Sequence, residues 1–413
     1  MPNAKDRMLE LKLMHNYTSF TSKTLTPTAK LSEEVWTVDV PKLAFSGATY
    51  LADAILAVSA LHLRSKDPYD KALIQASHMY MASSLVAYRD ALRAGVGQSN
   101  SEALFLTASL IAFQSTATRI FVGDDPIGDV GPPTASPANR IAAGPTQSSS
   151  TKSSYTPPLS CFHAFQGVKA VVVSSWPWIR NSSSVLTVIE SQPPLQLEGL
   201  NGPASFFGPL LEGLEEELAA EQDEKQSTAE AYAHAVAVLN WAHRSPNDAA
   251  HLIFPATVAR RYVDLLAERR PRALVILASF FAVMRRLEGI WWIGDVPKRE
   301  VLGIASLFDE SSPWRRHLEW PLKIVHAERP IPPELWGSEW PPEDDGGLPL
   351  HRAFPSRGSF VEHIEQVARM MIQNPTGNIV PGFFQLAQDL YGRGGAGAFE
   401  AQMMDVSDGG HVP

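Results

Sequence analysis

Apolar side chains recur at a helical period along most of this chain. Residues 51–62 show the pattern most clearly, and their apolar face consists of Leu51, Ile55, Val58 and His62. Intervals of three and four residues place side chains on one side of a helix. The same pattern predicts further helices over residues 68–93, 102–120, 162–174, 206–220, 228–243, 298–308, 360–373 and 383–391.

A helical hairpin is predicted over residues 257–268 and 272–287. Pro271 stands at its turn, and proline is well tolerated in the first turn of a helix because its missing N–H would be unpaired there anyway. Strands and helices do not alternate along the chain, and no internal repeat is visible. We therefore expect an all-α, multi-helix fold with at most two short strands.

Two stretches interrupt the helical pattern. Residues 122–158 are rich in Pro, Gly, Ser and Thr and hold few large apolar side chains, so they cannot offset the entropy lost on ordering. Residues 326–413 begin with another Pro-rich, irregular stretch and end with short helices. We expect one helical domain over residues 9–325, with a disordered insert at 122–158 and a C-terminal extension at 326–413.

Composition narrows the class of protein. Hydrophobic residues make up 45% of the 413 residues and charged residues 19%, which excludes a wholly disordered or fibrous chain. The net charge of -9 argues against general affinity for nucleic acid. Cys161 is the one cysteine, so no internal disulfide or cysteine zinc cluster can form, and we expect an intracellular protein. No apolar run is long enough to span a membrane.

Two short motifs suggest cofactor or metal chemistry but lack the required context. Residues 392–397 spell GxGxxG, yet they follow a predicted helix and not the strand that a dinucleotide site needs. Asp124, Asp125 and Asp129 resemble an aspartate-rich magnesium box, yet they lie in the Pro-rich insert and not on a rigid helix. We expect neither a metal nor a cofactor.

The chain contains ten tryptophans, which can fill a core or line a cavity. Pockets for small molecules are mostly apolar with a few polar groups, so we predict an internal apolar pocket among the strongest helices. His62 and His78 are the candidate polar groups on its wall. The alternative is that all these side chains interdigitate without a void. The predicted ligand-binding residues are Met79, Phe105, Phe113, Trp176, Phe281, Met284 and Trp292.

Several segments, in order, resemble the effector domain of fungal zinc-cluster transcription factors of the sterol uptake control type. The first is the pair of blocks at residues 11–18 and 22–25, which read LKLMHNYT and SKTL. The agreement in order and rough spacing runs from about residue 9 to 325. The further blocks are residues 36–45, 54–63, 165–170, 176–179, 270–278, the Trp291–Trp292 pair, and residues 314–321.

The resemblance implies a helical domain whose apolar pocket senses a sterol- or terpenoid-like metabolite, coupled to transcriptional regulation in the nucleus. The family's DNA-binding module carries six cysteines ahead of this domain, and the present sequence starts almost at the effector domain. We therefore expect no specific DNA binding by this chain itself. It would act as a homodimer or through a DNA-binding partner protein.

Two other interpretations remain open. The same fold could be repurposed as a metal- and cofactor-independent cyclase of the isomerase or lyase class, acting in the cytoplasm within a secondary-metabolite gene cluster. Holding a terpenoid or polyene in a reactive shape, as an intramolecular cycloaddition requires, can lower a barrier by orientation alone. No catalytic residue can be assigned, although His62 and His78 are candidates. The third interpretation is a purely structural or dimerisation domain.

Overall fold

The computed structural model describes residues 4–337, apart from gaps at 26–29, 122–154, 192–194, 196, 220–223, 246–247 and 288. Within these ranges the regular elements are helices, and no strand occurs. The prediction of an all-α fold is therefore confirmed. The predicted helices at 360–373 and 383–391, and the GxGxxG and aspartate motifs, lie outside the described residues.

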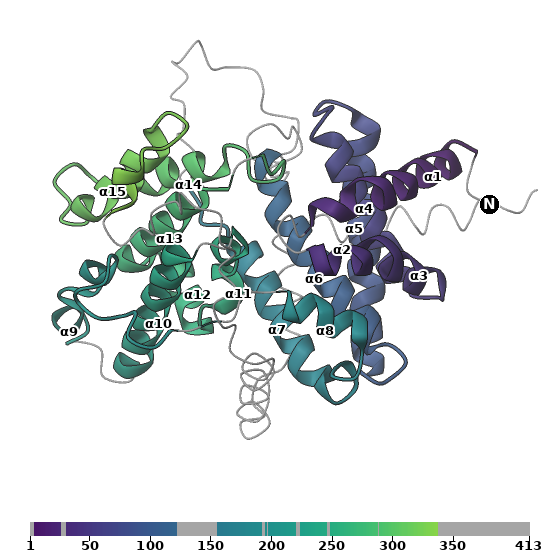
Figure 1. Cartoon of the computed structure of the whole chain (residues 1–413), viewed down its shortest axis with the longest axis horizontal. Coiled ribbons are helices and arrows are strands. Elements are labelled where there is room, and N and C mark those ends of the chain that lie inside the picture. Colours follow the sequence, from purple (N-terminus) through teal and green to yellow (C-terminus); the bar gives the residue numbers. More distant parts are fainter. Residues whose placement is uncertain are drawn as a thin grey trace, which may run out of the picture.

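The helices form two groups, coloured purple to teal and teal to light green in Figure 1. The first group surrounds α4 (Thr49–Arg64), whose residues 54–62 are all buried. Against it packs α5 (Lys71–Ala94), which begins where Asp70 accepts the backbone N–H groups of Ala72 and Leu73 at 2.9 and 3.2 Å. The remaining elements of this group are α1 (Ala4–Ser19), η1 (Thr21–Thr24), α2 (Lys30–Glu34), the π-helical turn η2 (Val35–Asp39), α3 (Val40–Phe45), α6 (Ser101–Ala117), η3 (Thr118–Phe121), α7 (Leu159–Ile179) and α8 (Ser183–Glu190).

The second group is built around α13 (Pro271–Met284), which is buried over its whole length after Pro271. Its charged residue, Arg272, pairs with Glu217 at 2.8 Å and donates to the carbonyls of Leu210 and Glu212. The other elements are η4 (Gly208–Leu211), α9 (Leu214–Glu217), α10 (Lys225–Arg244), η5 (Asp248–Leu252), α11 (Phe254–Thr257), α12 (Arg260–Ala267), α14 (Val296–Ala305), α15 (Arg315–His326) and η6 (Pro333–Trp336).

Each group has its own apolar core, and α6 and α7 connect the two. Phe105 on α6 belongs to the first core, whereas Ala117 at the end of the same helix belongs to the second. Phe162, near the start of α7, also packs into the second core. The two helices thus run from one core to the other, and the space between the cores is bounded by their sides.

The expected helix at residues 206–220 is not formed as one element. The structure has two short pieces there, η4 and α9, separated by Gly213 in the left-handed conformation with φ of 69°. Pro209 lies inside the segment and cannot donate a helical hydrogen bond. By contrast, the predicted hairpin at 257–287 is confirmed as α12 and α13, joined through Arg269 at φ of 55° and Pro271.

The predicted boundaries of the insert and of the C-terminal extension fall partly on described residues. Tyr155 and Pro158, within the expected insert, lie against the folded helices: Tyr155 donates to Glu300 at 2.7 Å, and Pro158 precedes α7. Residues 122–154 lie outside the described part. In the extension, Trp336 is buried, with 5% of its surface exposed, and packs beside Trp320.

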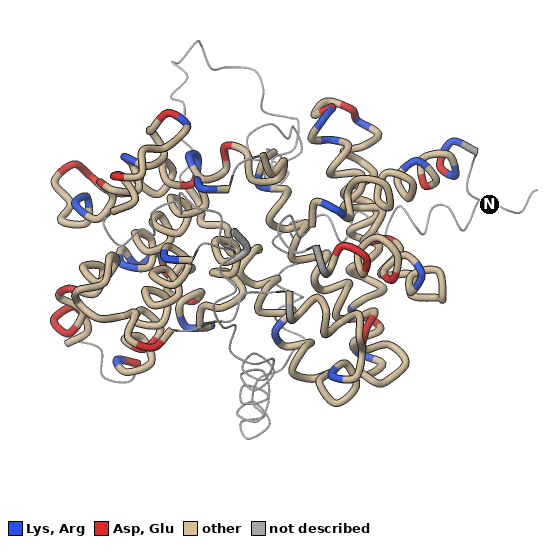
Figure 2. Tube along the Cα trace, viewed as in Figure 1, with Lys and Arg blue, Asp and Glu red and all other residues tan. Residues whose placement is uncertain are grey.

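Charged residues of both signs are interspersed over the described helices of both groups (Figure 2). By length and composition alone, Ser101–Phe121 is apolar enough to cross a membrane. Because 67% of its apolar window is buried among the other helices, it fits a core helix of a globular fold equally well.

Candidate ligand-binding cavity

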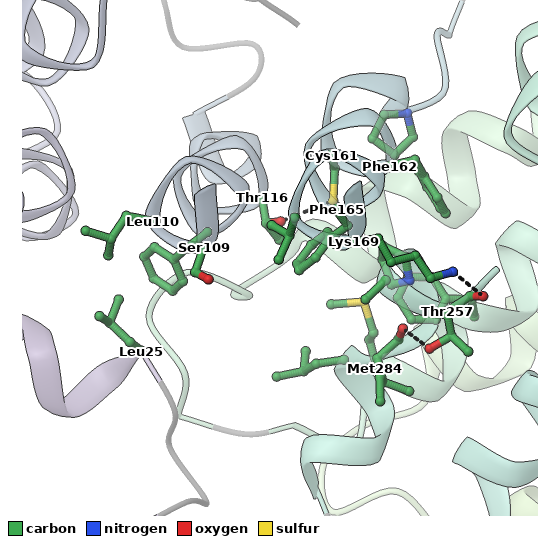
Figure 3. A pocket seen from close by; sticks show the side chains of 18 of the residues that line it. Leu25, Ser109, Leu110, Thr116, Cys161, Phe162, Phe165, Lys169, Thr257 and Met284 are labelled. Atoms are coloured by element: carbon green, nitrogen blue, oxygen red, sulfur yellow. Dashed lines mark hydrogen bonds between the residues drawn. The ribbon is translucent and has the colours of Figure 1, made fainter. Parts of the chain in front are cut away.

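A cavity of about 550 Å³ lies between the two apolar cores. Its size falls within the range of roughly 300–1,000 Å³ that is typical of small-molecule sites. Side chains from α6, α7 and α13, the 252–259 turn and Trp292 form most of its wall (Figure 3). The cavity therefore touches both groups of helices.

The wall on α6 is one face of that helix. Phe105, Ser109, Phe113 and Thr116 follow at intervals of four, four and three residues, and all line the cavity. This is the period that brings side chains to one side of a helix. Because α6 is apolar around most of its circumference, its other faces pack into the first core while this face borders the cavity.

The wall on α7 repeats the same spacing with more polar side chains. Cys161, Phe165 and Lys169 are four residues apart and line the cavity together. The Cys161 thiol lies 3.1 Å from the hydroxyl of Thr116 on α6, and burial raises the pKa of that thiol to about 11. The thiol is therefore protonated at neutral pH and acts as a packing group and not as a nucleophile.

Aromatic rings close the side toward α13. Phe280, Phe281 and Met284 contribute one turn of α13, and Trp292 follows the helix. The ring of Trp292 meets that of Phe113 edge-to-face, with centroids 5.3 Å apart. Trp292 also donates its indole N–H to the carbonyl of Thr24 at 3.3 Å, which fixes the ring between the two groups of helices.

Polar groups on the wall are few, and some gather where α7 faces α11. The carbonyl of Thr257 lies 3.4 Å from the Lys169 ammonium and 3.1 Å from Nε2 of His234. Gln166 donates to the next carbonyl, that of Val258, at 2.9 Å. Burial lowers the pKa of Lys169.

A buried carboxylate stands beside the cavity. Glu300 on α14 is fully buried and accepts hydrogen bonds from Arg119 at 3.1 Å and from Tyr155 at 2.7 Å. Arg119 lines the cavity and forms an ion pair with Glu300, which also pairs with Arg299 at 3.5 Å. The Tyr155 ring covers Gly303, where a Cβ atom would collide with the ring. This cluster joins the end of α6 to the second group of helices.

Five of the seven predicted ligand-binding residues line this cavity. They are Phe105, Phe113, Phe281, Met284 and Trp292. The other two lie elsewhere among the described helices. Trp176 is buried in the first core near the end of α7, and Met79 is 41% exposed on the outer side of α5.

The two candidate histidines do not line the cavity. His62 is buried on α4, where its Nδ1 lies 2.9 Å from the Thr21 hydroxyl and its ring stacks on Trp291 with centroids 4.8 Å apart. Burial, together with the charge of Lys66, lowers the pKa of His62 to about 4. His78 is partly buried on α5, which contributes no residue to the cavity wall. Neither is positioned to act on a molecule in the cavity.

Sequence reasoning missed the polar end of the cavity. Lys169 and Thr257 form it, with Phe165 and Cys161 beside them on α7. A signal was present: Lys169 is the one Asp, Glu, Lys or Arg in the 21 residues of α7, and its neighbours at positions 165 and 172 are apolar. A lone charge within a helix that is otherwise apolar can mark a cavity wall. Among the described residues, no group of three or more His, Cys, Asp or Glu could hold a metal ion.

The described residues thus form an all-helical fold with a mostly apolar cavity between its two cores. No protein-family model matches the chain. A Zn(2)-C6 fungal-type transcription factor of Gibberella zeae is 52% identical over 378 residues, which cover 89% of this chain and 71% of that protein. The transcription factor afumD of Aspergillus fumigatus, of the same type, is 27% identical over 66% of each chain. Sterol uptake control protein 2 of Candida albicans is 34% identical over 114 residues, 28% of this chain and 15% of that protein.

Identity at this level over most of both chains shows the family. The protein belongs to the Zn(2)-C6 fungal-type transcription factors, a class of transcriptional regulators. The resemblance to fungal zinc-cluster factors, inferred from short blocks of sequence, is thereby confirmed at the level of the family.

Proposed function

We propose that this chain is the ligand-binding effector region of a transcriptional regulator, and that it binds a bulky, mostly apolar metabolite in the cavity between its two cores. The cavity is the observation that carries the proposal. Its wall is formed largely by aromatic and aliphatic side chains, with a few polar groups at defined places. Burial of apolar ligand surface there would contribute roughly 25 cal/mol per Å² before the costs of association are subtracted.

The position of the cavity provides a route from binding to regulation. Phe105 and Phe113 come from α6, whereas Phe281 and Met284 come from the second group of helices. A ligand that contacts both groups favours whichever arrangement of them gives it the better contacts, and so shifts the population of the two states. We propose that this shift is passed to a DNA-binding element joined to or associated with residues 9–325, and that the protein acts in the nucleus.

The sterol- or terpenoid-like character of the ligand is part of this proposal. It is supported by the local similarity to sterol uptake control protein 2 and by the size and apolar lining of the cavity. Rigid polycyclic skeletons suit such a wall, because they lose little conformational entropy on binding.

The test is a binding assay in which the cavity is filled by mutation. The neutral dye Nile red reports entry into an apolar site by its fluorescence, and ergosterol and a neutral diterpenoid compete with it. We expect wild type to bind the dye and at least one competitor, and Met284→Trp to weaken both by tenfold or more. Met8→Trp is the matched control, because Met8 is 66% exposed on α1, a helix that contributes no residue to the cavity wall.

Equal binding by wild type and Met284→Trp would place the dye elsewhere and contradict the proposal. The recovered competitor should also be chemically unchanged. Conversion of the competitor to a cyclised product would contradict the regulator interpretation and favour the cyclase.

A further inference from the structure

Lys169 is a charged residue on the wall of a mostly apolar cavity, and no described acidic side chain forms an ion pair with it. It lies on α7, in the same helical row as Cys161 and Phe165. An ammonium has three N–H donors. The contact that the structure gives it is the Thr257 carbonyl, at 3.4 Å, which is long for such a bond.

That carbonyl satisfies the ammonium poorly, since Nε2 of His234 approaches the same oxygen at 3.1 Å. Among the described residues, Lys169 forms no ion pair. The remaining donors of the ammonium are therefore available to a molecule in the cavity.

Arg119 provides the comparison within the same cavity. It also lines the wall, but two of its guanidinium nitrogens donate to Glu300, one of them at 3.1 Å, and the same carboxylate forms a longer ion pair with Arg299 at 3.5 Å. Two donors of Arg119 are therefore already engaged by a carboxylate, and fewer remain for an anion in the cavity. Within the described part of the chain Lys169 pairs with no carboxylate, so an anion placed there would create a new ion pair in a site of low polarity, where electrostatic attraction is strong.

The titration of Lys169 agrees with this geometry. Burial is the cause that lowers its pKa, and no acidic side chain offsets that effect. A carboxylate placed beside the ammonium would raise the pKa again, because a nearby opposite charge favours the charged form. Binding of an acid and protonation of Lys169 are therefore coupled.

We propose that the ligand of this cavity is an apolar carboxylic acid whose carboxylate pairs with Lys169, an inference that rests on the proposed function and adds the ligand's chemical class to it. Figure 3 shows Lys169 and Thr257 on the opposite side of the cavity from Leu25 and Leu110. The carboxylate binds at the α7–α11 end, and the carbon skeleton extends between Phe165 and Met284 toward the first group of helices.

The experiment compares acids with their methyl esters. Abietic acid and oleic acid, each with its methyl ester, compete against Nile red for the wild-type chain and for Lys169→Met and Lys169→Arg. Methionine keeps the length of the side chain and removes the charge, whereas arginine keeps the charge. The two carbon skeletons differ in shape, so a preference shared by both acids reports the carboxylate.

We expect at least one acid to bind wild type tenfold or more tightly than its ester, since an added charge-assisted hydrogen bond changes affinity on that scale. Lys169→Met should abolish this preference and leave the ester unaffected, and Lys169→Arg should retain most of it. In wild type, affinity for the acid should fall as the pH rises through the lowered pKa of Lys169, while affinity for the ester stays constant.

The outcomes separate the two proposals. If the esters bind as well as the acids, or if Lys169→Met keeps the preference for acids, this inference is wrong and the proposed function stands. If neither Nile red nor any of the four probes binds, the proposed function fails and this inference with it. Should Lys169→Met fold poorly in a thermal melt, the pH dependence of wild type and the Lys169→Arg variant still decide the question.

Discussion

Two regions of this molecule are rich in aromatic rings, and one of them is filled whereas the other is open. The filled region is the aromatic cluster of Phe206, Phe207, His243, Trp320 and Trp336. Its rings pack on one another, with centroids 4.4 Å apart for Phe206 and His243 and 5.2 Å apart for Phe207 and Trp320. The open region is the cavity, where Phe113 and Trp292 meet but a space of about 550 Å³ remains.

The difference lies in the backbone that carries the rings. In the aromatic cluster, the turn after η6 brings the chain close to Phe206 at Gly337, whose φ is 91°, and a Cβ atom at Gly337 would collide with that ring. Hydrogen bonds then hold the contacts: Trp320 donates to the Leu335 carbonyl at 2.7 Å. In the cavity the rings come from α6 and α7 on one side and from α13 and the turn at Trp292 on the other, and each side packs largely into its own core. Aromatic content alone therefore does not distinguish a filled cluster from a cavity wall.

The largest expected effect is on stability, and it differs between the two regions. Phe207→Ala should lower the free energy of unfolding by about 3–5 kcal/mol, the usual loss for a phenylalanine in a filled core. The loss in free energy of unfolding for Phe281→Ala should be smaller than that for Phe207→Ala by at least about 1 kcal/mol. The Phe281 ring already borders a void and therefore has fewer contacts to lose. Urea unfolding at pH 7 measures both. Equal losses would mean that the cavity is closed in solution.

Acid should weaken the aromatic cluster through His243. Burial, with the charges of Arg286 and Arg244, lowers the pKa of His243 to about 4, although its bond to the Trp336 carbonyl acts in the other direction. The unfolded chain therefore binds a proton more readily than the folded one. Above pH 6.5, neutral His243 makes its full contribution to the free energy of unfolding. That contribution, roughly 3 kcal/mol, is lost as the pH falls toward 4.

The measurement is urea unfolding from pH 7 to pH 4.5 for wild type and His243→Gln. Glutamine can still donate to the Trp336 carbonyl but does not titrate in this range. The variant should lose less stability with acid than wild type. Parallel curves for the two proteins would show that His243 is not the source of the acid sensitivity.

The smallest expected effect is a gain in stability from filling the cavity. Met284→Trp should raise the free energy of unfolding by about 0.5–2 kcal/mol, as is common when a void is filled. Introducing a tryptophan at a filled site should instead destabilise by about 1–3 kcal/mol. Leu210→Trp, buried beside the aromatic cluster, provides that contrast in the same urea assay. Loss of stability in both variants would contradict the difference between the two regions.

Helical periodicity predicted the fold because it depends on local spacing. The helices that became α6 and α13 were predicted from that spacing, and Phe105, Phe113, Phe281 and Met284, chosen on them as large side chains, line the cavity. Met79 was misplaced because a size-based choice ignores which face of α5 points outward. The short elements at 208–217 were missed because Gly213 adopts a left-handed conformation that periodicity does not reveal.

The polar end of the site could not be predicted in the same way. Lys169 and Thr257 are brought together from α7 and α11, which are far apart in the sequence. Pairing across such a separation is set by the packing of the two cores and not by any local pattern. The sequence did show that Lys169 is the single acidic or basic residue, histidine apart, in a mostly apolar helix.

The Glu300 carboxylate binds both flanks of residues 122–154, Arg119 on one side and Tyr155 on the other. The two flanks therefore meet at one carboxylate, next to the cavity wall to which Arg119 and Pro158 contribute. For protein engineering, this is an insertion site whose two ends, at Arg119 and Tyr155, are both fixed by Glu300. We expect a circularly permuted fluorescent protein inserted between those flanks to be held beside the cavity wall, where its brightness would report occupancy in living cells.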